Sequence, residues 1–93
     1  MEFEIRKTEN CFVNSETYEY SLPITAEEFL KLIEDDYSVR LNTRLRRPVF
    51  IAESEDIKIK AVLKSQKIRV SFDEARWKEL KEQFEAFLSS SRS

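Results

Sequence analysis

Two hydrophobic periodicities alternate along this 93-residue chain, and their order restricts the folds open to it. In some stretches apolar residues return at every second position, which is typical of half-buried strands. In two others they return every three or four positions, which is typical of amphipathic helices. The order is strand, strand, helix, four strands, helix. It predicts an α+β fold with a mainly antiparallel sheet, in the order ββαββββα, and two amphipathic helices packed on one face.

The segment up to the first helix shows the strand period twice. Residues 1–6 alternate apolar and charged side chains, and a second strand is expected over residues 12–22, with a loop or a bulge near its start. Thr25 and Glu28 then form the pattern of a capping box. A helix is therefore expected to begin near Ala26 and to end by about Asp36.

The middle of the chain predicts four strands. The first covers residues 39–46, a short one follows proline over residues 49–52, and the last two form a hairpin within residues 57–72. A register that pairs Ile59 with Phe72 places all the apolar pairs of the hairpin on one face. A two-residue turn and a four-residue loop both fit this hairpin, because the turn lacks the glycine or asparagine of the commonest short type.

The last helix is expected to follow a second capping box, formed by Ser71 and Glu74. Its apolar residues run from Trp77 to Leu88 at spacings of three and four. We expect Trp77 to pack in the core, although a stacking or partner contact near the helix start is also open. Residues 1–88 are thus expected to form a single α+β domain, and residues 89–93 a disordered polar tail.

Missing residue types exclude several kinds of chemistry. The chain contains no histidine and one cysteine, Cys11, so a Ser/His/Asp triad and a single-chain zinc site are impossible. It contains no glycine, which excludes glycine-rich phosphate loops. We therefore expect no catalytic residues, no metal and no cofactor. A lone cysteine and the lack of a long apolar run predict a soluble, cytoplasmic protein with no membrane partner.

Charge is segregated along the chain. Residues 1–37 carry ten acids and three bases, whereas residues 38–70 carry nine bases and three acids. The nine bases of the middle block are the candidate anion-binding or nucleic-acid-binding residues, namely Arg40, Arg44, Arg46, Arg47, Lys58, Lys60, Lys64, Lys67 and Arg69. Such a block predicts a surface for phosphate or carboxylate groups. Alternatively, Glu2 and Glu4 neutralise it, if the first strand pairs beside Lys58 and Lys60.

Residues 70–83 read Val-Ser-Phe-Asp-Glu-Ala-Arg-Trp-Lys-Glu-Leu-Lys-Glu-Gln. This stretch resembles the strand-to-helix junction of the positive-cofactor-four family of single-stranded-DNA-binding coactivators, and four strands followed by a helix over residues 41–88 resemble that family's core. The resemblance implies a sheet that binds single strands through Lys67 and Arg69, and dimerisation through the helix region. The chain lacks the family's glycine before this strand, and its acidic first 37 residues have no counterpart there.

A fainter likeness concerns the first strand, where Glu2, Glu4 and Arg6 alternate as in the CYTH triphosphate-processing enzymes. It implies a carboxylate-and-metal enzyme, but the chain is too short for that family's tunnel barrel. The favoured prediction is a small non-enzymatic binding module that uses a basic sheet face, for single-stranded nucleic acid or another polyanion. The alternative is an interaction or assembly subunit that binds an acidic protein partner. A homodimer is compatible with either.

Overall fold

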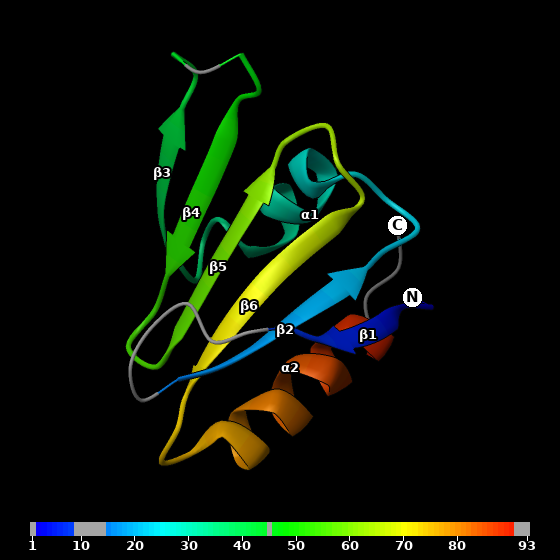
Figure 1. Ribbon diagram of the computed structural model, residues 1–93, viewed down its shortest axis with the longest axis vertical. Helices are drawn as coiled ribbons and strands as arrows, with labels where there is room; N and C mark the ends of the chain where they lie inside the picture. Colours follow the sequence, from blue (N-terminus) through cyan, green and yellow to red (C-terminus); the bar gives the residue numbers. More distant parts are fainter. Residues whose placement is uncertain (1, 9–14, 45, 91–93) are drawn as a thin grey trace.

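The computed structural model describes residues 2–8, 15–44 and 46–90, which form one antiparallel sheet covered by two helices (Figure 1). The strands are β1 (Glu4–Lys7), β2 (Ser15–Ser21), β3 (Ser38–Asn42), β4 (Val49–Glu53), β5 (Ile57–Val62) and β6 (Lys67–Asp73). The helices are α1 (Ala26–Ile33) and α2 (Trp77–Ser90). This confirms the α+β class and the order ββαββββα.

The six strands lie in the order β1-β2-β6-β5-β4-β3, and every neighbouring pair is antiparallel. β6, the last strand in sequence, therefore lies between β2 and β5. The sheet has two open edges, one along β1 and the other along β3.

Both helices pack on the same face of the sheet. Phe84 of α2 contacts Phe29 of α1, with ring centroids 6.2 Å apart, and it also contacts Tyr20 of β2 and Phe72 of β6 at 5.2 and 5.9 Å. All four rings are buried. Every second residue of the central strands joins this core, because side chains alternate between the faces of a sheet. The residues in between point to the other face, which we call the open face.

The start of α1 follows the predicted capping box. Thr25 Oγ1 accepts a hydrogen bond of 3.3 Å from the Glu28 backbone N–H, and Glu28 Oε1 lies 3.3 Å from the same hydroxyl. The cap satisfies one of the N–H groups that a helix start leaves without a partner. The helix ends at Ile33, three residues before Asp36.

The start of α2 differs from the prediction. Ser71 is not a cap, because it lies inside β6, where its buried hydroxyl is 2.9 Å from that of Thr17 on β2. The chain turns at Asp73 instead: Asp73 Oδ1 accepts a hydrogen bond of 3.1 Å from the Ala75 N–H, and α2 begins at Trp77. The helix continues to Ser90, so residues 89 and 90 of the expected tail are helical, and residues 91–93 lie outside the described residues.

Two further expectations about strands were wrong. The strand expected over residues 39–46 ends at Asn42, whose side chain accepts a hydrogen bond of 3.2 Å from the Arg44 N–H and begins the loop. In the β5–β6 hairpin, Ile59 pairs with Val70 and not with Phe72. This two-residue shift keeps each side chain on its predicted face, and it leaves the longer connection, residues 63–66, between the strands.

Part of the expected second strand, residues 12–14, lies outside the described residues, as does Cys11. No helix in the described part of the chain is long and apolar enough to cross a membrane.

A candidate anion-binding face

The antiparallel register aligns side chains from all six strands in a single row across the open face. The row crosses the sheet from edge to edge through Arg40, Ile51, Lys60, Arg69, Glu19 and Arg6. Neighbouring strands lie about 4.8 Å apart, so successive members of the row are direct neighbours. Four of these six residues are cationic, and the row brings together Arg40, Lys60 and Arg69 from the predicted set.

The central pair of the row consists of two cations. Lys60 on β5 lies directly opposite Arg69 on β6, and both are exposed. Like charges at opposed positions of a ladder are destabilising, so this pair costs the fold some stability. Lys67, two residues before Arg69 on β6, adds a third cation on the same face. Neither Lys60 nor Lys67 forms an ion pair with a described residue.

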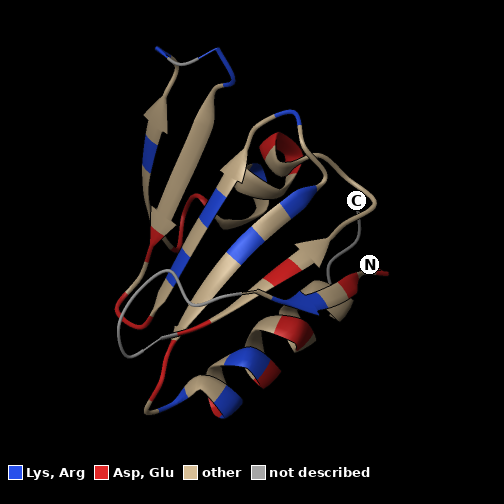
Figure 2. Cartoon of the chain, in the orientation of Figure 1, with Lys and Arg blue, Asp and Glu red and all other residues tan. Residues whose placement is uncertain are grey.

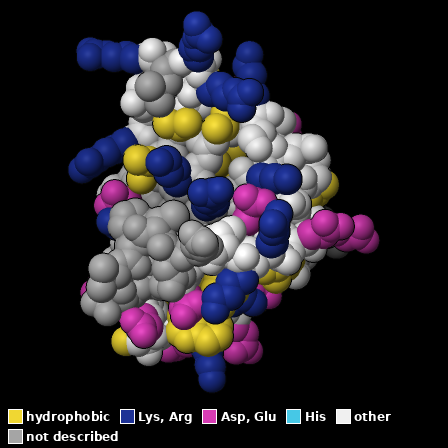
Figure 3. Space-filling view, viewed as in Figure 1, with side chains coloured by type: hydrophobic (Ala, Val, Ile, Leu, Met, Phe, Trp, Pro, Cys, Tyr) yellow, Lys and Arg dark blue, Asp and Glu magenta, His cyan; other side chains and the backbone are white. Residues whose placement is uncertain are grey.

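A groove with a volume of about 600 Å³ lies over these strands. Its half-buried aliphatic members are Val49 and Ile51 from β4 and Val62 from β5. The cations Lys58, Lys60, Lys67 and Arg69 line it as well. Figure 3 shows Lys and Arg side chains gathered on this face, with hydrophobic side chains between them. The groove therefore offers an aliphatic surface bordered by positive charge.

The sequence missed most of the uncharged residues of this groove. Val49 and Ile51 were predicted only as members of a short strand, and Thr17 and Ser71 had no predicted place in a site. Val62 was the one visible signal, because it is the only apolar residue on the hairpin face that carries Lys58, Lys60 and Lys64. Alternation shows that a strand has two faces, but it does not show which face the helices will cover. In the sequence, a single aliphatic residue among cations therefore looks like an exception to a polar face.

The alternative in which Glu2 and Glu4 neutralise the basic face required the first strand to lie beside Lys58 and Lys60, and it does not. β1 pairs with β2, so Glu4 lies opposite Ser21 at the edge of the sheet, far in strand order from Lys58 and Lys60 on β5. Other carboxylates reach the face. Glu19 lies 3.8 Å from Arg69, and Glu53 lies opposite Lys58. The ion pair of Arg69 is exposed on the arginine side, so it neutralises the face only partly.

The four arginines of the β3 region divide into two groups. Arg40 lies on β3, whereas Arg44, Arg46 and Arg47 lie in the connection between β3 and β4 (Figure 2). The strand expected over residues 39–46 would have placed Arg40, Arg44 and Arg46 on one face, but the chain leaves the sheet before Arg44. All four are exposed, and none forms an ion pair with a described residue. Lys64, the ninth predicted cation, is exposed in the β5–β6 connection.

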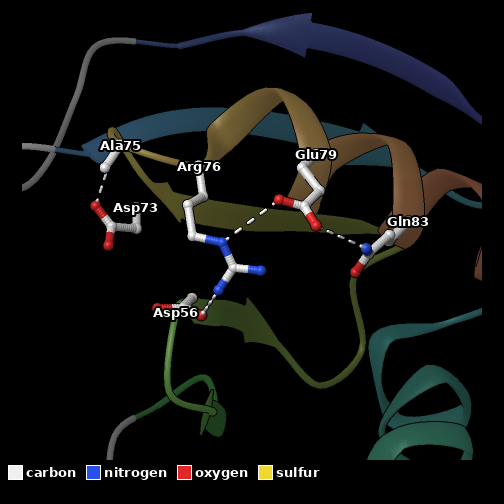
Figure 4. A network of polar contacts seen from close by, with 6 residues as sticks. All are labelled: Asp56, Asp73, Ala75, Arg76, Glu79 and Gln83. Carbon is white, nitrogen blue, oxygen red and sulfur yellow. Dashed lines mark hydrogen bonds and ion pairs between the residues drawn. The ribbon is translucent and has the colours of Figure 1, made fainter.

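Two cations near α2, Arg76 and Lys81, contrast with those of the open face, because they have carboxylate partners. Arg76 lies 2.8 Å from Asp56 Oδ2 and 3.5 Å from Glu79 Oε2, and Glu79 also accepts a hydrogen bond from Gln83 (Figure 4). The hydrogen bond and charge of Glu79, followed by the charge of Asp56, raise the pKa of Arg76. Lys81 similarly pairs with Glu85 at 2.6 Å. The fold thus pairs Arg76 and Lys81 with carboxylates, whereas Lys60 and Lys67 on the open face form no ion pair with a described residue.

The described aromatic residues of the sheet belong to the helix-covered face. Trp77 is half-buried and stacks on Tyr18 with ring centroids 6.2 Å apart, so its expected packing role is confirmed. Phe50 of β4 is fully buried in the core, so it is not placed to stack on a nucleic-acid base. Among the residues lining the groove, none is aromatic.

Polar groups in the core have a structural role. The buried Tyr20 hydroxyl donates a hydrogen bond of 3.0 Å to Glu85 Oε2, and burial together with that carboxylate raises the pKa of Tyr20. Within the described residues, no group of three or more acidic, cysteine or histidine side chains is placed to hold a metal ion. Glu34, Asp35 and Asp36 follow α1 and are exposed.

No family model, curated protein or solved structure matches this chain. The resemblance of residues 70–83 to the positive-cofactor-four family stays a prediction, and so does the fainter likeness to the CYTH enzymes. The function must therefore be argued from the open face itself.

Proposed function

We propose that this protein is a small non-enzymatic binding module that takes a polyanion on its open sheet face. The observation that carries the proposal is the placement of Lys60 directly opposite Arg69, beside Lys67, over a groove that neither α1 nor α2 covers. Juxtaposed like charges cost stability, and a bound anion would offset that cost by pairing with them.

Single-stranded nucleic acid is the specific ligand that the sequence predicts. Lys60, Lys67 and Arg69 suit its phosphates, and binding of this kind weakens as salt concentration rises. Sequence-tolerant binders of single strands also stack bases on aromatic side chains. The groove lacks that platform, so phosphate contacts would carry the affinity.

An acidic protein is the second candidate, and the aliphatic groove residues favour it. Val49, Ile51 and Val62 are half-buried and lie among cations. This combination suits a partner that presents apolar side chains between carboxylates, because both kinds of group would then be matched. With either ligand we propose a cytoplasmic location, because a chain with a single cysteine forms no disulfide within itself and suits a reducing compartment.

The test compares two variants of equal charge on opposite sides of the molecule. The first, Lys60→Ala with Lys67→Ala, removes two cations from the open face. The control, Lys31→Ala with Lys78→Ala, removes two exposed cations from α1 and α2. Heparin retention and fluorescence anisotropy with a labelled oligothymidylate measure binding.

We expect the open-face variant to lose about tenfold or more in affinity, because each lost phosphate contact reduces both the affinity and its salt dependence. The control should stay near the wild type. Equal losses in both variants would mean that net charge alone drives binding, and the proposal would then be wrong.

A further inference from the structure

No strand among the described residues lies beside the outer edge of β3. β3 is the last strand of the sheet and pairs only with β4. Four of its five residues are exposed, and no proline interrupts it. An edge strand presents unpaired N–H and C=O groups along its free side, and an extended chain can pair with them.

The side chains along this edge differ between the two faces. On the open face, the central residue of β3 is Arg40. On the helix-covered face, Leu41 is 57% exposed, the highest value among the large hydrophobic residues described. An incoming strand would thus meet a cation on one side and uncovered apolar surface on the other.

The positive charge continues past the end of the strand. Arg44, Arg46 and Arg47 follow β3 within five residues of Asn42, and residues 38–48 contain no acidic side chain. Natural edge strands often carry a charged residue that prevents pairing with a copy of themselves. In register, two β3 edges would place Arg40 opposite Arg40, which is destabilising. This edge therefore disfavours a second copy and favours an acidic strand.

We propose that β3 accepts an extended segment of an acidic partner protein as a seventh strand, in which acidic and apolar residues alternate. Its carboxylates lie on the open face beside Arg40, and its apolar side chains cover Leu41. The arginines after β3 hold further carboxylates of the same segment. This inference rests on the proposed polyanion function and specifies a polypeptide as the partner.

Three observations favour a polypeptide over a nucleic acid. Backbone pairing at a strand edge is available to a peptide and not to a sugar-phosphate chain. Leu41 matches an apolar side chain of a peptide. The groove lining offers no ring on which a base could stack.

The probe is a labelled peptide of about nine residues that alternates glutamate and valine. A control peptide of the same composition groups the glutamates in one half, so that it keeps the charge but loses the alternation. We expect the alternating peptide to bind more tightly than the control peptide in fluorescence anisotropy. Arg40→Glu should weaken its binding about tenfold, because an opposed pair becomes a like-charged pair.

Arg6→Glu is the matched control variant. Arg6 is exposed on the open face of β1, the opposite edge, so its replacement makes the same charge change far from β3. We expect its peptide affinity to stay within about twofold of the wild type, since surface charges beyond a Debye length are screened. Equal weakening by both replacements would overturn the proposal.

Hydrogen exchange separates strand addition from loose electrostatic contact. Pairing at the edge should slow exchange of backbone amides in residues 38–42 when the alternating peptide is added. Peptide binding without slower exchange in these residues would overturn the proposal. It would also be overturned if an oligothymidylate bound more tightly than the peptide and lost its affinity in Arg40→Glu. The two proposals can fail separately. If the variant with Lys60→Ala and Lys67→Ala binds heparin like the wild type, while the peptide still slows amide exchange in residues 38–42, only the proposed polyanion binding in the groove is wrong.

Discussion

The Tyr20 hydroxyl and Glu85 Oε2 lie 3.0 Å apart and join β2 to the second half of α2 inside the helix-covered face. Lys81 Nζ lies 2.6 Å from the same carboxylate oxygen. Glu85 thus satisfies a buried phenol and pairs with a half-buried ammonium group. It is the polar link between the helix and the aromatic core.

Replacement of Glu85 by alanine should destabilise the protein. It leaves the Tyr20 hydroxyl without a partner, and an unsatisfied buried polar group costs about 1–3 kcal/mol. Urea denaturation of the variant should show a free energy of unfolding lower by that amount. Glu82→Ala serves as the control, because Glu82 is exposed on the same helix, and its effect should stay within about 0.5 kcal/mol.

Tyr20 should make stability fall in alkaline solution. Its pKa is raised in the folded state by burial and by Glu85. The unfolded chain ionises this phenol near its ordinary pKa of about 10, while the folded protein keeps the proton. The stabilisation is therefore complete below pH 10 and is lost progressively above it. In Tyr20→Phe, the free energy of unfolding should fall less steeply between about pH 9 and 11. Identical slopes would contradict the assignment.

The opposed cations of the groove predict that a replacement which removes their repulsion will stabilise the fold and weaken anion binding. Lys60→Glu converts the Lys60–Arg69 pair into an opposed pair of opposite charge. We expect the free energy of unfolding to rise by about 0.2–1 kcal/mol, while heparin affinity falls. Added salt should narrow the stability difference between the two proteins, because it screens both interactions. A variant that loses stability along with binding would show that Lys60 supports the fold.

The turn before α2 provides a test of how that helix begins. Asp73→Ala removes the acceptor for the Ala75 N–H and should cost about 0.5–2 kcal/mol in unfolding free energy, the range measured for lost helix caps. Asp73→Asn keeps a side-chain oxygen and should recover most of that loss. If Asp73→Asn is as unstable as Asp73→Ala, the carboxylate charge matters more than the hydrogen bond.

Periodicity predicted the sequence of elements here because it reports which residues must be buried. Phe29 and Phe84 occupy helix positions whose spacing requires a core, and both lie in it. Local motifs were less reliable. Thr25 and Ser71 begin the same four-residue pattern, yet only Thr25 caps a helix, because Ser71 is held in β6 by pairing with β2. Pairing between distant segments overrides a local preference of about 1 kcal/mol.

The composition of the candidate site was predictable, but its arrangement was not. All nine cations are exposed, as a polar face requires. Their neighbours depend on strand order, and β6 lies between β2 and β5 although 45 residues separate the end of β2 from its start. Alternation within a strand carries no information about its partner. For this reason Glu19 reaches Arg69, while Glu4 remains at the edge.

Helices on only one side of the sheet have a consequence for how this protein can change. Side chains such as Lys67 point away from the aromatic core, so replacing them leaves the packing that holds the fold together untouched. Selection or design could therefore replace side chains of the open face while keeping those of the helix-covered face. A family of such chains would diverge fastest at alternate positions of β4, β5 and β6, and its members would share a scaffold while binding different ligands.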